Sequence, residues 1–169
     1  IIMEEGGTVD KYEGDAIIAF WNAPLAQPDH AIRACRAALR CQRKLAERRK
    51  EFYDRTGVDM FMRIGIHTGP ALRVATGYFG SNVILSARVA EEAAPGEILV
   101  SSAIVQKLSE PGLSVDAGRW VTLKGIPEAC LVFSLPWRSK RESFEKPSAW
   151  SPAHEAMCLA FGSVRETGA

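Results

Sequence analysis

No run of apolar residues in this sequence is long enough to cross a bilayer, which takes about 20 residues, and its first residues lack the pattern of a signal peptide. We therefore expect a soluble, cytoplasmic segment without membrane contact. Charge of one sign is not in excess either, because 21 Lys and Arg residues stand against 20 Asp and Glu residues. This balance argues against a protein that coats nucleic acid and against a polybasic membrane anchor. An anionic ligand would have to be held by local groups.

Cysteine is scarce, and its four positions do not have the spacing of metal ligands. The residues are Cys35, Cys41, Cys130 and Cys158. We interpret them as reduced thiols.

The length of 169 residues, with 47% apolar residues, suffices for one hydrophobic core and leaves little for a second. Beyond Trp137 the composition shifts to Arg, Lys, Ser, Glu and Pro. We therefore predict one domain over residues 1–137 and a linker or tail over residues 138–169.

A β-hairpin is predicted near the start of the chain, because two β-prone runs, 7–12 and 16–21, flank Glu13-Gly14-Asp15. If the turn has two residues, Tyr12 pairs with Asp15 and Lys11 with Ala16. Lys11 and Asp15 would then leave the hairpin on opposite faces.

The rest of the domain alternates between helix and strand patterns. Asp29 offers an N-cap for a long helix that reaches Phe52, and residues 60–67 have the length and apolar character of a central strand. A glycine-punctuated loop precedes a buried helix over 83–90. Strands at 97–100, 120–123 and 131–135 and a short helix to about residue 108 complete the pattern. This order predicts an α+β sandwich with its helices on one face of the sheet.

Three blocks of the sequence, in this order, resemble class III adenylate/guanylate cyclase catalytic domains, a family of bacterial nucleotidyl cyclases among others. The blocks are residues 6–24 with Asp29-His30-Ala31, residues 63–69 (RIGIHTG), and Leu123-Lys124-Gly125 with the strand that follows it. The resemblance covers residues 5–137. It implies a ferredoxin-like sandwich, and because the first strand and helices of such domains precede the hairpin by some tens of residues, we expect this chain to lack them.

The resemblance also implies a reaction. In this family the ribose 3′-hydroxyl of ATP attacks the α-phosphate, and cyclic AMP and pyrophosphate are formed. Two Mg²⁺ or Mn²⁺ ions held by two aspartates assist this step. By resemblance Asp15 is the second of these aspartates, and the first is expected upstream of this sequence. We therefore expect one metal ligand to be missing and the fragment by itself to be inactive.

Further site residues follow from the same resemblance. Lys11 matches the lysine that recognises the purine edge in adenylate-specific members. Lys124 matches the lysine that neutralises the triphosphate, and Arg88 the arginine that binds the transferring phosphate. A solvated strand-end lysine and a helical surface ion pair remain the alternative interpretations of Lys11 and Arg88.

Two positions depart from the family pattern. Ile84 stands one helical turn before Arg88, where active members have an asparagine that binds the ribose, and an isoleucine offers no hydrogen bond. Gly77 aligns with a second purine-recognising aspartate, in a loop that is shorter than usual. The sequence therefore predicts a substrate site that has lost two of the polar side chains of active members.

Two functions remain open at this point. The first is a nucleotidyl cyclase domain that binds ATP or another nucleoside triphosphate and works as a head-to-tail homodimer or heterodimer of cyclase domains. The second is a catalytically inactive, cyclase-like dimerisation or regulatory domain of a signalling protein. An RNA-recognition module lacks the paired strand aromatics that would stack on bases. A diguanylate cyclase would carry an acidic Gly-Gly-Asp/Glu-Glu-Phe turn, which is absent from the sequence.

Overall fold

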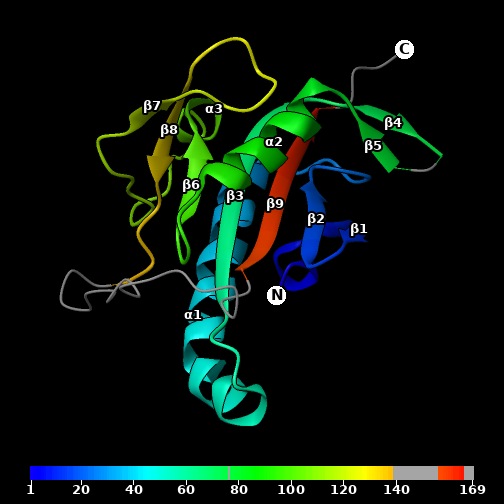
Figure 1. Cartoon of the computed structure of the whole chain (residues 1–169). Coiled ribbons are helices and arrows are strands. Elements are labelled where there is room, and N and C mark those ends of the chain that lie inside the picture. Colours follow the sequence, from blue (N-terminus) through cyan, green and yellow to red (C-terminus); the bar gives the residue numbers. More distant parts are fainter. Residues whose placement is uncertain (76, 139–155, 166–169) are drawn as a thin grey trace.

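The computed structural model describes residues 1–75 and 77–138, and the backbone of residues 156–165 (Figure 1). Its elements, in chain order, are η1 (Met3–Glu5), β1 (Thr8–Glu13), β2 (Ala16–Trp21), α1 (His30–Thr56), β3 (Phe61–Pro70), β4 (Leu72–Val74), β5 (Gly77–Phe79), α2 (Ser81–Glu92), β6 (Ile98–Ser101), α3 (Ser102–Val105), β7 (Arg119–Val121), β8 (Cys130–Ser134) and β9 (Ala156–Arg165). The predicted hairpin, long helix, central strand and second helix are all present. The glycine-punctuated loop before α2 differs from the prediction, because it forms the small β4–β5 hairpin.

The main sheet is mixed and has the strand order β1-β2-β9-β3-β6-β8-β7. Strands β2, β9, β3 and β6 run parallel to one another, whereas β1, β8 and β7 extend the sheet through antiparallel pairs. Figure 1 shows β3 and β9 at the centre, with α1 behind the sheet and α2 in front of it.

Helices cover both faces of this sheet, so the prediction of helices on one face is wrong. The cause is visible in β3, where Ile64 and Ile66 belong to the core that packs on α1. Gly65, between them, faces α2 so closely that an added Cβ would lie 2.2 Å from the backbone nitrogen of Ala90. Since successive residues of a strand point to opposite faces, β3 packs on α1 through Ile64 and Ile66 and on α2 through Gly65.

The β1–β2 hairpin has a different register from the predicted one. Glu13 pairs with Ala16, and Tyr12 with Ile17, so the two turn residues are Gly14 and Asp15. Gly14 has a φ of 62°, which suits a glycine at this turn position. Asp15 therefore lies in the turn, and the predicted pair of Tyr12 with Asp15 does not form.

The C-terminal segment differs from the prediction of a linker or tail over residues 138–169. Ala156–Arg165 form β9, which lies between β2 and β3 and is parallel to both. Composition alone did not indicate this strand, because a backbone that finds two neighbours for its hydrogen bonds needs no strong local signal. The remaining residues of the predicted tail beyond 138 lie outside the described part.

Candidate functional site

A β-bulge at Asp10 brings two charged side chains of β1 next to the same neighbouring strand. Val9 pairs with Ala19, but Lys11 pairs with Ile18, so Asp10 is an extra residue in β1. In a regular strand adjacent residues point to opposite faces. Here Asp10 reaches Gly77 of β5, and the Lys11 ammonium lies 5.8 Å from the ring centroid of Phe79, two residues further along β5.

The β4–β5 hairpin is held against the β1–β2 hairpin by an aromatic contact. The rings of Tyr78 and Phe20 lie 4.6 Å apart between centroids, and both side chains are buried. This contact fixes the position of β5 and hence of Gly77. The oxygen Oδ1 of Asp10 lies 2.9 Å from the point that a Cβ on Gly77 would occupy. The carboxylate thus takes the space of the side chain that Gly77 lacks.

An open groove of about 680 Å³ lies between the two hairpins. Its walls are both polar and apolar, and they consist of Thr8, Asp10, Pro24, Arg73, Val74, Ala75, Gly77 and Tyr78. The volume falls in the range of small-molecule sites. Of the residues predicted from the sequence, Gly77 lines this groove and Lys11 lies beside it.

Asp15 is exposed in the turn of the β1–β2 hairpin. Within the described part of the chain its carboxylate makes no hydrogen bond or ion pair. No group of three or more His, Cys, Asp or Glu side chains suited to a metal ion occurs among the described residues. Asp15 could supply one oxygen ligand to Mg²⁺ or Mn²⁺, but these residues do not by themselves complete a two-metal site.

Helix α2 presents Ile84 and Arg88 one turn apart on the same face. Ile84 is 56% exposed, so it is not part of the core. The Arg88 guanidinium donates from one nitrogen to both carboxylate oxygens of Glu91, at 2.6 Å each. Its Nε is buried and has no hydrogen-bond partner among the described residues. Arg88 therefore forms the helical ion pair that was considered as an alternative, while one of its donors stays unused.

Lys124 is exposed on the turn that follows β7. The preceding residue, Leu123, is buried in the cluster that contains Val89 of α2. The Leu-Lys-Gly segment is thus anchored next to the helix that carries Arg88. The Lys124 ammonium makes no ion pair or hydrogen bond to any described residue.

A chain of polar contacts connects the ends of β3 and β6 with the start of α2. Buried His67 contacts the Ser101 hydroxyl through Nδ1 at 2.8 Å and Asn82 Oδ1 through Nε2 at 2.9 Å. The Asn82 amide also donates to the Pro70 carbonyl at 2.7 Å. Burial lowers the pKa of His67, which the hydrogen bond to Asn82 partly offsets. The neutral ring therefore fixes the first turn of α2, which is a structural role.

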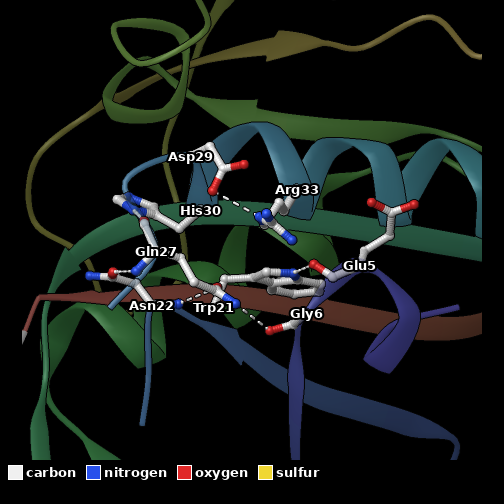
Figure 2. Close-up of polar contacts among 8 residues, drawn as sticks. All are labelled: Glu5, Gly6, Trp21, Asn22, Gln27, Asp29, His30 and Arg33. Carbon is white, nitrogen blue, oxygen red and sulfur yellow. Dashed lines mark hydrogen bonds and ion pairs between the residues drawn. The ribbon is translucent and has the colours of Figure 1, made fainter. Parts of the chain in front are cut away.

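The loop between β2 and α1 is closed by side-chain amides (Figure 2). The backbone N–H of Asn22 donates to Gln27 Oε1 at 2.9 Å, and the side-chain Nε2 of Gln27 donates to the Gly6 carbonyl at 2.8 Å. The Trp21 indole donates to the Glu5 carbonyl at 3.0 Å. These bonds tie the end of β2 to the start of β1, and so stabilise the hairpin that carries the candidate site residues.

The predicted N-cap residue of α1 is at the expected position, but it does not make the hydrogen bond of an N-cap. Asp29 is the residue before the helix, yet its side chain caps no backbone amide. It accepts instead from Arg33 Nε at 2.8 Å, and this hydrogen bond lowers the pKa of Asp29.

The structure brings together some of the predicted residues and leaves others apart. Gly77 lines the groove, Lys11 lies near Phe79 of the same strand, and Ile84 and Arg88 share a helix face. Asp15 and Lys124 have no described contact with either pair. Asp10 was missed in the sequence, where it stands directly before Lys11. Asp10 lies near Gly77 because β1 has a bulge, and no sequence signal here indicates that bulge.

The described part of the chain contains no helix that is both long and apolar enough to cross a membrane. The family model for the adenylate and guanylate cyclase catalytic domain matches residues 5–136. This match spans most of the chain, which therefore belongs to that family, as its motifs predicted.

Comparisons with individual proteins agree with this assignment. Adenylate cyclase 1 of Rhizobium meliloti (strain 1021) is 38% identical over 73 residues, which cover 43% of this chain and 11% of that protein. The chain thus spans about a tenth of the length of this relative.

Two solved structures have the same fold. The guanylyl cyclase Cya2 aligns with a TM-score of 0.67 at 25% identity, over 79% of this chain and 72% of that chain. The adenylyl cyclase CyaB from P. aeruginosa aligns with a TM-score of 0.68 at 21% identity, over 85% and 78%. The α+β fold of the class III cyclase type, predicted from the motifs, is therefore confirmed.

Proposed function

We propose that this chain forms a nucleotidyl cyclase domain whose substrate is ATP and whose substrate site has lost part of its polar groups. The reaction is an attack of the ribose 3′-hydroxyl on the α-phosphate. A new P–O bond closes the cyclic phosphate, the bond to the β-phosphate breaks, and pyrophosphate leaves. The observation that carries the proposal is the family match over residues 5–136.

Two cations would receive the phosphates. Arg88 has a buried, unused Nε, and its present partner Glu91 is a neighbour on the helix surface. Surface ion pairs of this kind contribute little to stability, so a phosphate can replace the Glu91 carboxylate at small cost. Lys124 is exposed and without a partner among the described residues, which leaves its ammonium available for the triphosphate.

Divalent cations, Mg²⁺ or Mn²⁺, would offset the charge of the triphosphate. Asp15 is our proposed ligand from this chain, since its exposed carboxylate has no competing partner in the described part. The other ligands must come from residues outside that part or from a second chain.

Dimerisation is proposed through one face of the β4–β5 hairpin. Leu72 and Phe79 pair across the two strands and are 63% and 47% exposed, and Val74 on the same face is also exposed. An apolar face of this kind is typical of an interaction surface. A second cyclase domain is the occupant that the family assignment favours, in a head-to-tail homodimer or heterodimer.

The alternative function is a catalytically inactive domain that dimerises and regulates a larger signalling protein. The exposed Ile84 favours it, because an apolar side chain beside Arg88 gives no hydrogen bond to a ribose and suits a protein contact.

ATP binding by the purified chain distinguishes the two functions. ATP titrated in MgCl₂ by microscale thermophoresis should bind, and Arg88→Ala and Lys124→Ala should each weaken binding about ten-fold, because each removes a charged contact to phosphate. Lys50→Ala serves as the control, since Lys50 is an exposed lysine on α1 that pairs, within the described residues, with Asp54. Chromatography should detect no cyclic AMP from this chain alone.

The result that contradicts the cyclase proposal is a lack of ATP binding at millimolar concentration. If sedimentation then still shows a dimer, and Phe79→Glu abolishes it, the regulatory function is supported.

A further inference from the structure

We infer that Glu91 alternates between two arginines: it holds Arg88 in the free chain and pairs with Arg63 when Arg88 binds phosphate. The inference rests on the proposed binding of ATP, in which Arg88 contacts the triphosphate. It assigns two positioning residues, Glu91 and Arg63, that act on the nucleotide through Arg88. The sequence motifs indicated a site role for neither of them.

Glu91 is the residue that both guanidinium groups contact. Nη1 of Arg88 donates to the two carboxylate oxygens of Glu91, at 2.6 Å each. Arg63 comes from β3, and its Nη1 donates to the backbone carbonyl of Glu91 at 3.2 Å. Because Arg63 is bound to the backbone of Glu91, its guanidinium lies within reach of the Glu91 side chain. Rotation about the side-chain bonds of Glu91 can therefore move the carboxylate from one arginine to the other.

Both arginines have a donor that is not used. Nε of Arg63 and Nε of Arg88 are buried, and neither has a hydrogen-bond partner among the described residues. A buried donor without an acceptor is unfavourable, so each guanidinium gains from a further acceptor. Glu91 supplies one carboxylate for two cations, and each of them has a place for it.

A bound phosphate would displace this carboxylate from Arg88. Phosphate and carboxylate repel each other when they approach the same guanidinium. The Glu91 side chain is 52% exposed and free to turn, and an exposed helical ion pair of this kind contributes little to stability. Arg63 then receives the displaced carboxylate. It thus lowers the free-energy cost of making Arg88 available to phosphate.

A double-mutant cycle tests this exchange. ATP is titrated in MgCl₂ into the whole chain, into Glu91→Gln, into Arg63→Gln and into the double variant. Glu91→Gln should bind ATP about three-fold more tightly, because Arg88 no longer has to leave an ion pair. Arg63→Gln should bind ATP about three-fold more weakly, because the displaced carboxylate has no second partner. When Glu91 is already glutamine, Arg63→Gln should leave the affinity unchanged.

The last result separates the exchange from a merely structural role of Arg63. Arg63 donates to the backbone carbonyl of residue 91, which Glu91→Gln retains. A structural contribution of this bond, or a general attraction of the Arg63 charge for ATP, would therefore be the same with Glu91 and with glutamine. Glu92→Gln is the matched control, because it removes a carboxylate from the adjacent exposed residue of α2. It should change the affinity for ATP less than Glu91→Gln does.

Far-ultraviolet circular dichroism shows whether each variant is folded. If Arg63→Gln weakens ATP binding equally in both backgrounds, or in neither, the inference is overturned while ATP binding stands. The same holds if Glu91→Gln binds ATP no more tightly than Glu92→Gln, a comparison that decides by itself if the Arg63 variants do not fold. If the unchanged chain does not bind ATP, the inference and the proposed function both fail.

Discussion

Asp10 occupies the space that a side chain on Gly77 would need, with its Oδ1 2.9 Å from the position of that missing Cβ. The two residues are far apart in the sequence and come from different hairpins. Their contact exists because β1 has a bulge and because Tyr78 packs on Phe20. Position 77, where the family resemblance leads us to expect an aspartate, has no carboxylate of its own. The Asp10 carboxylate of β1 lies beside it.

Gly77→Ala should lower the free energy of unfolding by about 2–3 kcal/mol, because alanine is strained at a φ of 132° and contacts Asp10. Urea denaturation measures the loss. Gly14→Ala is the control and should cost only about 1 kcal/mol, since Gly14 has open space around it. Asp10→Ala combined with Gly77→Ala should recover part of the loss, and strictly additive effects would contradict the contact.

Gly65→Ala should destabilise the fold by about 3 kcal/mol or more, because the new methyl group would overlap the backbone of Ala90 and force α2 away from β3. Thermal unfolding checks this expectation. Gly57→Ala at the end of α1, where nothing lies within 4 Å, should cost about 1 kcal/mol for its left-handed φ of 70°. Equal losses in the two variants would mean that α2 does not pack on this face.

Stability should decrease as the pH falls below about 6.5, the ordinary pKa of histidine, partly through His67. Burial lowers the pKa of His67 in the folded chain, so the unfolded chain takes up the proton first and is favoured at lower pH. The contribution is complete above pH 6.5 and is lost as the pH falls towards the folded-state pKa. Denaturation between pH 8 and pH 5 measures it. His67→Gln should have a smaller pH dependence than the unchanged chain in this window, and identical slopes would exclude the effect.

Ile84→Asn should change the free energy of unfolding by no more than about 0.5 kcal/mol, because Ile84 is 56% exposed. In the whole protein it should raise cyclase turnover by roughly 10- to 100-fold if the ribose gains a hydrogen bond. Leu85→Asn is the comparison, since the partly buried Leu85 packs on the α2 core and its replacement should cost about 2 kcal/mol. Unchanged turnover with unchanged stability would indicate that this face of α2 serves a protein contact.

Much of this protein was determined locally by its sequence. The hairpin, the long α1 and the second helix follow from residue periodicity and from glycine and proline positions, which act over a few residues. The motif order identified the family. It also assigned Arg88 and Lys124 to phosphate through short motifs, and that assignment stays a prediction.

The tertiary structure decided what depends on distant neighbours. Either pair in Glu13-Gly14-Asp15 could form the turn, and the choice of Gly14 and Asp15 shifted every pair of the hairpin. The β4–β5 hairpin packs against the β1–β2 hairpin. Because β1 has a bulge at Asp10, this packing places the Asp10 carboxylate beside Gly77. Gly65 lets α2 approach β3 on the face opposite α1, and the gap between β2 and β3 accepts β9. Each of these features depends on hydrogen bonds or contacts between segments that are remote in sequence, and no local pattern encodes them.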